Sequence, residues 1–170
     1  MLLDDVCKAC ESPRPRSFAG LMEMYEWNYI RLRRLCPDLT ELDAYSISQV
    51  PDALDLHLRV LEQCPFTTTL GLTYVFFDVQ AGVQANPDLR LRVYHDARQV
   101  EVLGRACRHR RGRVRVEDLP GDTVLECKWK LNRFLYKWLS YCLRQGHSFA
   151  REHRVTPEPG YEPGLLTSLP

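Results

Sequence analysis

Residues 89–107 read LRLRVYHDARQVEVLGRAC, and this stretch decides the fold. In its first half apolar side chains alternate with polar ones, a period of two that indicates a strand with one buried face. The alternation returns at 99–102, where Val100 and Val102 again share a face. The residues in between hold Asp96 and no glycine, which favours a type I turn. We therefore expect an antiparallel hairpin that the rest of the chain covers on one face.

More strands are expected on the N-terminal side of this hairpin. Residues 42–49 suit a short strand, and residues 54–60 alternate apolar and polar side chains, which places His57 on the solvent face. Residues 67–77 are rich in threonine and aromatic side chains and predict an antiparallel neighbour. The turn formers in 78–88 predict a loop before the hairpin.

Two amphipathic helices flank the strands. Apolar residues recur at intervals of three and four from Ser17 to Cys36; Ser17 can cap the start of this helix and Pro37 ends it. The same period returns over 122–146, where Gly146 is the stop signal. We expect both helices to pack on the sheet.

The second helix has more large apolar side chains than one face can hold. Its main stripe includes Phe134 and Trp138 and is expected to cover the sheet. Trp129, Tyr136 and Tyr141 fall off this stripe. Aromatic side chains on the outer face of a helix indicate a surface that meets a partner.

The predicted fold class is therefore α+β: an antiparallel meander of four to five strands, covered on one face by an N-terminal and a C-terminal helix. Residues 1–16 lack a sustained period and are expected to form a flexible arm. Residues 17–148 form a single domain, and the Pro- and Gly-rich residues 149–170 are expected to be a disordered tail.

Composition indicates a soluble cytoplasmic protein. Of 170 residues 45% are hydrophobic and 26% are charged, and the apolar runs are too short to cross a bilayer. The start carries two acids where an export signal carries basic residues. We expect the seven cysteines to be reduced. Cys7-x-x-Cys10 has no second pair to complete a metal site, so neither metal nor cofactor is expected, and whether these two thiols bind a metal or have a redox role stays open.

Charge is distributed unevenly. Between Arg90 and Arg115 there are nine arginines against Asp96 and Glu101, a formal charge of +7, although the whole chain carries +1. Guanidinium groups suit phosphates and carboxylates, so this segment predicts an anionic partner: an acidic protein, a nucleotide or nucleic acid. The alternative is a solvated surface without a partner. No recognition helix, zinc finger or aromatic platform accompanies the arginines, which weakens the case for nucleic acid. The candidate binding residues are Arg92, Tyr94, His95, Asp96, Arg105, Arg108, Arg110, Arg111 and Arg113.

The turn of the hairpin also invites a catalytic hypothesis. Asp96 could orient His95 as a general base, with Glu62 or Glu26 in a second acid or base role. No nucleophile or oxyanion donor is identifiable, so no catalytic residue is assigned. We favour a small non-enzymatic binding or regulatory protein over an enzyme.

Four ordered motifs are similar to those of the YqiB-like family of uncharacterised bacterial cytoplasmic proteins. The first, E-x-N-[YF]-x-x-L-x-x-L-x-P, is met by Glu26, Asn28, Tyr29, Leu32, Leu35 and Pro37. The second is met by Glu62, Phe66, Thr67 and Thr68. The third, R-[LV]-Y-H-D-A followed by E-V, is met by residues 92–97, Glu101 and Val102. The fourth is met by Lys128, Asn132, Phe134, Leu135, Trp138, Leu139, Cys142, Leu143 and Gly146.

The resemblance covers residues 26–146 and departs from the pattern between Arg108 and Cys127. It implies no activity, because the family has none established. It does add weight to the polar residues of the motifs, which we expect to meet in one pocket or one buried network. Those residues are Glu26, Asn28, Glu62, His95, Asp96, Lys128 and Asn132.

Overall fold

The computed structural model describes residues 17–104, 106–109, 112–115 and 121–158, of which 106–109, 112–115 and 122 are described by their backbone alone. The elements follow one another as helix, seven strands, helix and strand. In chain order they are α1 (Phe18–Leu35), β1 (Tyr45–Ser48), β2 (Leu56–Gln63), β3 (Thr67–Asp78), β4 (Gly82–Tyr94), β5 (Gln99–Val102), β6 (Ala106–His109), β7 (Gly112–Arg115), α2 (Gly121–Gln145) and β8 (Arg154–Val155).

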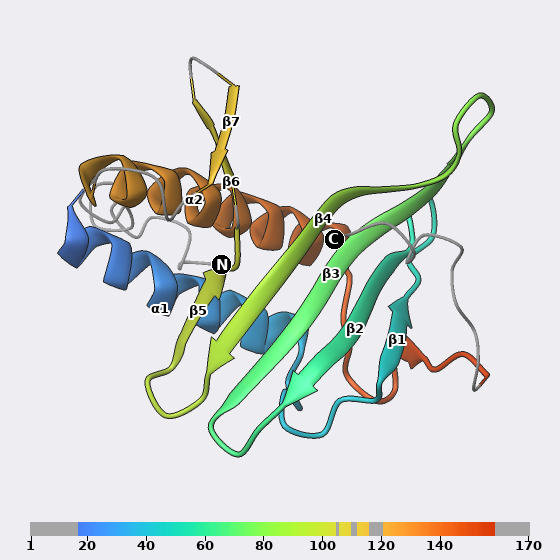
Figure 1. The fold of residues 1–170 in the computed structure, drawn as a ribbon. Coiled ribbons are helices and arrows are strands. Elements are labelled where there is room, and N and C mark those ends of the chain that lie inside the picture. Colours follow the sequence, from blue (N-terminus) through green and yellow to red (C-terminus); the bar gives the residue numbers. More distant parts are fainter. Residues whose placement is uncertain (1–16, 105, 110–111, 116–120, 159–170) are drawn as a thin grey trace, which may run out of the picture.

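One antiparallel sheet has the strand order β5-β4-β3-β2-β1-β8, and a separate ladder pairs β6 with β7 (Figure 1). The predicted α+β class and the meander from β1 to β5 are confirmed. The sheet has six strands where four to five were expected, because β8 adds a strand beside β1. The predicted hairpin is β4 and β5, in which Val93 pairs with Val100.

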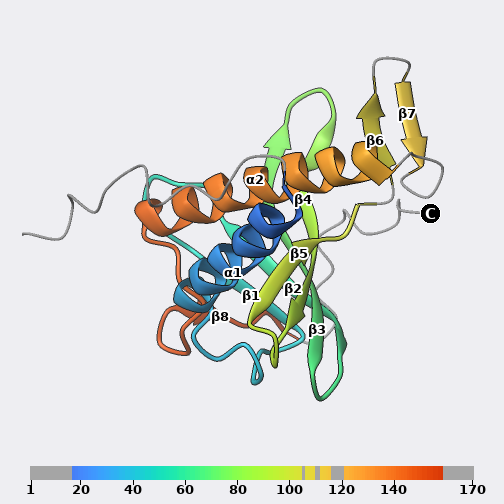
Figure 2. The ribbon, with the colours of Figure 1, turned by 90° about the vertical axis from the view of Figure 1, so that its left-hand side faces the viewer.

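Both helices lie on the same side of this sheet, as Figures 1 and 2 show. The limits of α1 follow the local signals: the Ser17 hydroxyl accepts the Gly20 N–H at 2.9 Å, and the helix ends before Pro37. Alternate sheet residues such as Leu58 and Leu72 are fully buried against the helices. The opposite face of the sheet carries no helix among the described residues, and we call it the outer face (Figure 2).

The expected loop at 78–88 is mostly strand. Only residues 79–81 connect β3 to β4, and the Asp78 carboxylate closes this turn by accepting the N–H groups of Gln80 and Ala81 at 2.8 Å each. Pro87 lies beside a register shift, where a strand tolerates a residue without a donor. Turn formers therefore mark an irregular strand here.

Residues 149–158 correct the expected start of the disordered tail. Phe149 is fully buried, and its N–H donates to the carbonyl of Leu35 at 2.7 Å. Residues 154 and 155 then pair with β1. The Phe149 side chain thus belongs to the core, and the fold continues beyond α2. Residues 1–16, with Cys7 and Cys10, and residues 159–170 lie outside the described residues.

Three predicted exposures are wrong. His57 is only 5% exposed, and its Nδ1 lies 2.6 Å from the Tyr45 hydroxyl. Trp129 is 5% exposed, whereas Phe134 is 45% exposed. Trp129 packs against the first half of α1, in a cluster with Tyr25 that contains no sheet residue. The first half of α2 therefore buries a different stripe from the one that faces the sheet.

The cysteines follow the expected reduced state only in part. Cys36 and Cys142 are buried free thiols, and Cys64 is an exposed one. Cys127 is disulfide-bonded, which corrects the expectation for that residue. Neither helix of the described chain combines the length and the hydropathy that a membrane span requires.

Candidate functional site

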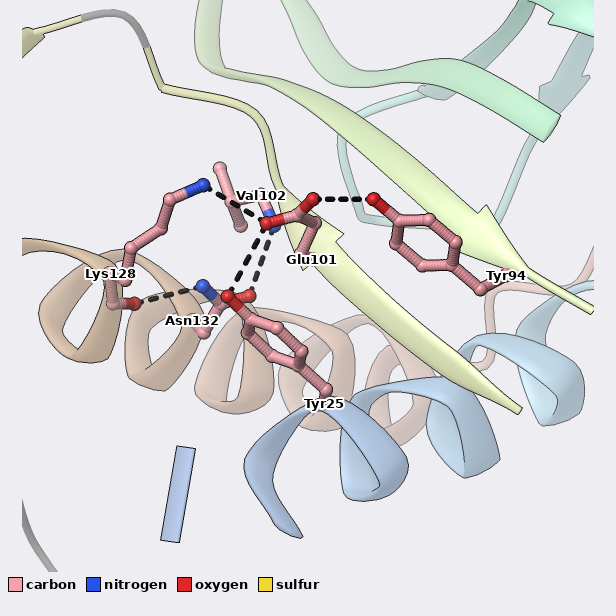
Figure 3. A network of polar contacts seen from close by, with 6 residues as sticks. All are labelled: Tyr25, Tyr94, Glu101, Val102, Lys128 and Asn132. Atoms are coloured by element: carbon pink, nitrogen blue, oxygen red, sulfur yellow. Dashed lines mark hydrogen bonds and ion pairs between the residues drawn. The ribbon is translucent and has the colours of Figure 1, made fainter. Parts of the chain in front are cut away.

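A polar network among the described residues surrounds Glu101, on the edge strand β5 (Figure 3). One carboxylate oxygen accepts the Tyr94 hydroxyl at 2.7 Å. The other accepts the Tyr25 hydroxyl at 3.3 Å and the Lys128 ammonium at 3.0 Å. The Glu101 side chain is 15% exposed. Four elements, α1, β4, β5 and α2, therefore meet at one carboxylate.

The surroundings fix the charge state of this carboxylate. Burial alone would raise the pKa of Glu101, but the hydrogen bonds from Tyr94 and Lys128, with the Lys128 charge, outweigh burial and lower that pKa. Burial, followed by the negative charge of Glu101, raises the pKa of Tyr25. Burial and the hydrogen bond to Glu101 also raise the pKa of Tyr94. At neutral pH Glu101 is ionised and both tyrosines are donors, so none of the three is poised to exchange a proton.

Asn132 extends the network into the backbone. Its Oδ1 accepts the Val102 N–H at 3.0 Å, and its Nδ2 donates to the Lys128 carbonyl at 2.8 Å. Asn28, on α1, donates from Nδ2 to the Asn132 carbonyl at 3.2 Å. Both asparagines are fully buried. The edge strand is thus attached to α2, and α2 to α1, through side-chain amides.

Part of the expected polar network assembles in this way. Asn28, Lys128 and Asn132 come together, but Glu26 is exposed on α1, and Glu62 is exposed on β2 with its carboxylate 3.9 Å from the Arg92 guanidinium. Glu101 was not among the candidates, although it belongs to the third motif. The sequence shows only an acidic residue between Val100 and Val102, and the position of Glu101 on an edge strand is known from the structure.

The hairpin turn does not form a catalytic pair. His95 is half-buried, and its Nε2 lies 2.9 Å from the Thr68 hydroxyl. The backbone N–H of His95 donates to the Phe66 carbonyl at 2.9 Å. Burial, followed by the charge of Arg33, lowers the pKa of His95. The exposed Asp96 carboxylate accepts the Ala97 N–H at 2.9 Å. No hydrogen bond joins His95 to Asp96, both of which are described, so the turn is held by its own backbone contacts.

The outer face of the sheet brings arginines together from different strands. Arg59 of β2 pairs with Gly71 of β3, which pairs with Arg90 of β4, so the three positions form one row. Because Arg59 follows the buried Leu58, its side chain points to the outer face. A Cβ placed at Gly71 would meet no atom within 4 Å, so space is open between the two arginines.

The bonding of these arginines differs. Arg92, two residues beyond Arg90, contacts Glu62 and lies 3.4 Å from the Thr69 hydroxyl. Arg59 and Arg90 form neither an ion pair nor a hydrogen bond with any other side chain in the described part of the chain. Their charges act on the carboxyl of Asp88, whose pKa is raised by burial and lowered by both arginines, with burial the larger effect.

The other predicted arginines lie in 105–115, whose side chains are outside the description. That applies to Arg105, Arg108, Arg110, Arg111 and Arg113. The backbone there forms the β6–β7 ladder, which stands away from the main sheet (Figure 1). Sequence reasoning missed Arg59; the period-two alternation around it was the signal. Within the described ranges, no cluster of histidine, cysteine and acidic side chains could hold a metal ion.

The chain is similar to proteins of one family. A family model described as "Protein of unknown function (DUF1249)" matches residues 31–148. "Uncharacterized protein YqiB" of Escherichia coli strain K12 is 28% identical over 131 residues, which are 76% of this chain and 90% of that protein. The YqiB proteins of Escherichia coli O6:H1 and O157:H7 match with the same identity and coverage. No solved structure matches the chain significantly. The resemblance found in the motifs is confirmed, and the chain belongs to the DUF1249 family of proteins of unknown function.

Proposed function

We propose that the protein is a small non-enzymatic binding protein that meets an anionic partner through arginines on the outer face of its sheet. One observation carries the proposal: Arg59 and Arg90 flank Gly71 on a face without a helix, and neither has an ion-pair partner among the described residues. Two like charges held on β2 and β4, the strands on either side of β3, repel each other. An anion placed between them relieves this repulsion and gains charge-assisted hydrogen bonds.

The basic segment extends this surface along the sequence. Arg92 continues the β4 side of the row, and the arginines of 105–115 follow in the chain. Attraction over this surface would be mostly electrostatic, so the affinity is expected to fall as salt rises. A cytoplasmic location and a regulatory role stay predictions from the sequence.

The enzyme hypothesis has less support. His95 has a hydroxyl beside its Nε2, while Asp96 is turned to the backbone. The Glu101 carboxylate accepts three donors and has a lowered pKa, which makes it a poor base at neutral pH. Neither arrangement offers a nucleophile with an adjacent base.

A binding measurement tests the proposal. Fluorescence anisotropy would compare labelled adenosine triphosphate, a short single-stranded RNA and a polyglutamate peptide at about 50 mM and about 200 mM salt. We expect binding to at least one of them that weakens at the higher salt, and a loss of about tenfold in affinity for the Arg59→Ala, Arg90→Ala double variant.

The matched control removes the same charge elsewhere. Arg133 and Arg144 are exposed on α2, on the other side of the sheet. The Arg133→Ala, Arg144→Ala double variant should keep the wild-type affinity. The proposal is refuted if no anion binds with salt dependence, or if the control loses as much affinity as the outer-face variant.

A further inference from the structure

We propose that Gly71, with Arg59 and Arg90 on either side, forms a seat for one phosphate group of a small phosphorylated molecule. This inference rests on the proposed function and names the chemical class of its ligand. Adjacent strands lie roughly 4.8 Å apart, so the two arginine Cα atoms are about 10 Å apart across β3. Both side chains are long enough to turn inward over the glycine, where a Cβ would have no neighbour within 4 Å.

The choice of phosphate follows from charge. A phosphate monoester carries about −1.5 to −2 at neutral pH and three acceptor oxygens. Two guanidinium groups attract such a dianion in spite of the neighbouring Asp88, and each can donate two parallel hydrogen bonds to a pair of oxygens. A carboxylate or a phosphodiester offers only two charged oxygens, which one guanidinium group occupies when it binds them in parallel, so it is less suited to bridge both arginines.

The surroundings limit the ligand to a single phosphate. Glu62 and Asp88 flank the row on the same face, and Glu62 already faces Arg92. The neighbouring Thr73 hydroxyl donates to the Tyr74 carbonyl. A nucleic-acid strand gains affinity when several of its phosphates are neutralised in succession, and the acids on both sides of the row oppose such a path. The described outer face therefore favours one compact dianion over a polymer.

Gly71→Val provides the decisive variant. A valine at this position meets open space and has a higher strand propensity than glycine, so the variant should fold with an unchanged or higher melting temperature. Its side chain would occupy the proposed seat. Thr73→Val, on the same strand and the same face, is the matched control and leaves the seat open.

Isothermal titration calorimetry would measure the binding of four ligands: inorganic phosphate, adenosine monophosphate, adenosine and a short oligodeoxythymidylate without a terminal phosphate. We expect phosphate and the monophosphate to bind, adenosine not to bind, and Gly71→Val to weaken both bound ligands by at least about tenfold. Asp88→Asn should strengthen them several-fold, because it removes a negative charge beside the seat. Thr73→Val should bind as the wild type does.

The outcomes separate this inference from the proposed function. If Gly71→Val folds and binds phosphate as the wild type does, the seat is refuted. Binding of the oligonucleotide without binding of phosphate would also refute the seat, while leaving the anionic-partner proposal in place. If no anion binds at all, both fail. If Gly71→Val does not fold, the same titrations are made with the Arg59→Ala and Arg90→Ala variants. Unchanged phosphate affinity in both variants would overturn the inference.

Discussion

Replacing Glu101 by glutamine tests whether the polar network stabilises the fold. The change keeps the shape of the side chain but removes the negative charge that pairs with Lys128 and accepts hydrogen bonds from the hydroxyls of Tyr25 and Tyr94. Breaking a fully buried ion pair costs roughly 3–5 kcal/mol, and an exposed pair contributes about 0–1 kcal/mol. With side chains 22% exposed for Lys128 and 15% for Glu101, this pair lies between those limits. We expect a loss of about 2–3 kcal/mol in the free energy of unfolding.

Urea denaturation at pH 7 measures this loss, and a melting temperature lower by about 5–10 °C should accompany it. Glu26→Gln is the matched control, because Glu26 is exposed on α1 and the chemical change is the same. The control should stay within about 0.5 kcal/mol of the wild type. An effect of Glu101→Gln as small as that of the control would refute the stabilising role of the network.

The effect of pH on this difference has a definite sign. The pKa of Glu101 is lower in the folded protein than its ordinary value of about 4.3, so folding favours the ionised form. The resulting stabilisation is complete above the unfolded pKa and disappears as pH falls through the folded one. The difference between wild type and Glu101→Gln should therefore be full at pH 7 and shrink below about pH 4. A difference that grows on acidification would contradict the assignment.

Three further substitutions test the packing. Asn132→Ala leaves the Val102 N–H without its acceptor and should lower the free energy of unfolding, measured by urea denaturation, by about 2–3 kcal/mol. An effect below about 0.5 kcal/mol would contradict the role of the amide. Phe149→Ala empties a fully buried site and should lower the free energy of unfolding by about 3–5 kcal/mol. Phe77→Ala, at a side chain that is 73% exposed, should leave it nearly unchanged. Equal melting temperatures of the two variants would refute the burial argument. Arg31→Lys removes a guanidinium group that lies 3.8 Å from the Tyr136 ring centre and donates to the Tyr136 hydroxyl at 2.7 Å. This change should lower the free energy of unfolding by about 1–2 kcal/mol, and an unchanged urea midpoint would contradict the prediction.

The elements that local signals define were predictable. The alternation in 89–102 fixes the β4–β5 hairpin because a period of two leaves only one face to bury. The start and end of α1 follow from a hydroxyl that accepts an orphan N–H and a proline that cannot continue the helix. These features depend on residues a few positions apart, which a sequence displays directly.

Burial depends on neighbours that are distant in the sequence. His57 has a polar position in its strand, and the alternation placed it correctly on the face opposite Leu58, yet it is buried there beside Tyr45. Trp129 fell outside the predicted apolar stripe of α2 because that prediction assumed that α2 packs against a single surface. Half of α2 faces α1 instead, and helix-to-helix contact selects other residues.

The Glu101 network shows the same dependence on topology. Alternation with two buried valines correctly turns Glu101 away from the core. Only its place on an edge strand lets Tyr25 and Lys128, from helices beside that edge, reach the carboxylate. No spacing in the sequence relates position 25 to position 101, so the meeting of these residues could not be predicted from periodicity.

Glu101 and the pair Arg59 and Arg90 differ in their bonding within the described chain. Both oxygens of Glu101 are already bonded to donors within the chain, and the residues around it are motif residues of the family together with Tyr25. Arg59, Gly71 and Arg90 belong to none of the four motifs, and among the described residues the two arginines form no ion pair within bonding distance, although their charges act on Asp88. A ligand gains most where polar groups are unbonded and accessible. The motif residues Tyr94, Glu101, Lys128 and Asn132 therefore join the helices to the sheet, whereas the proposed binding surface centres on Arg59 and Arg90, which lie outside the motifs.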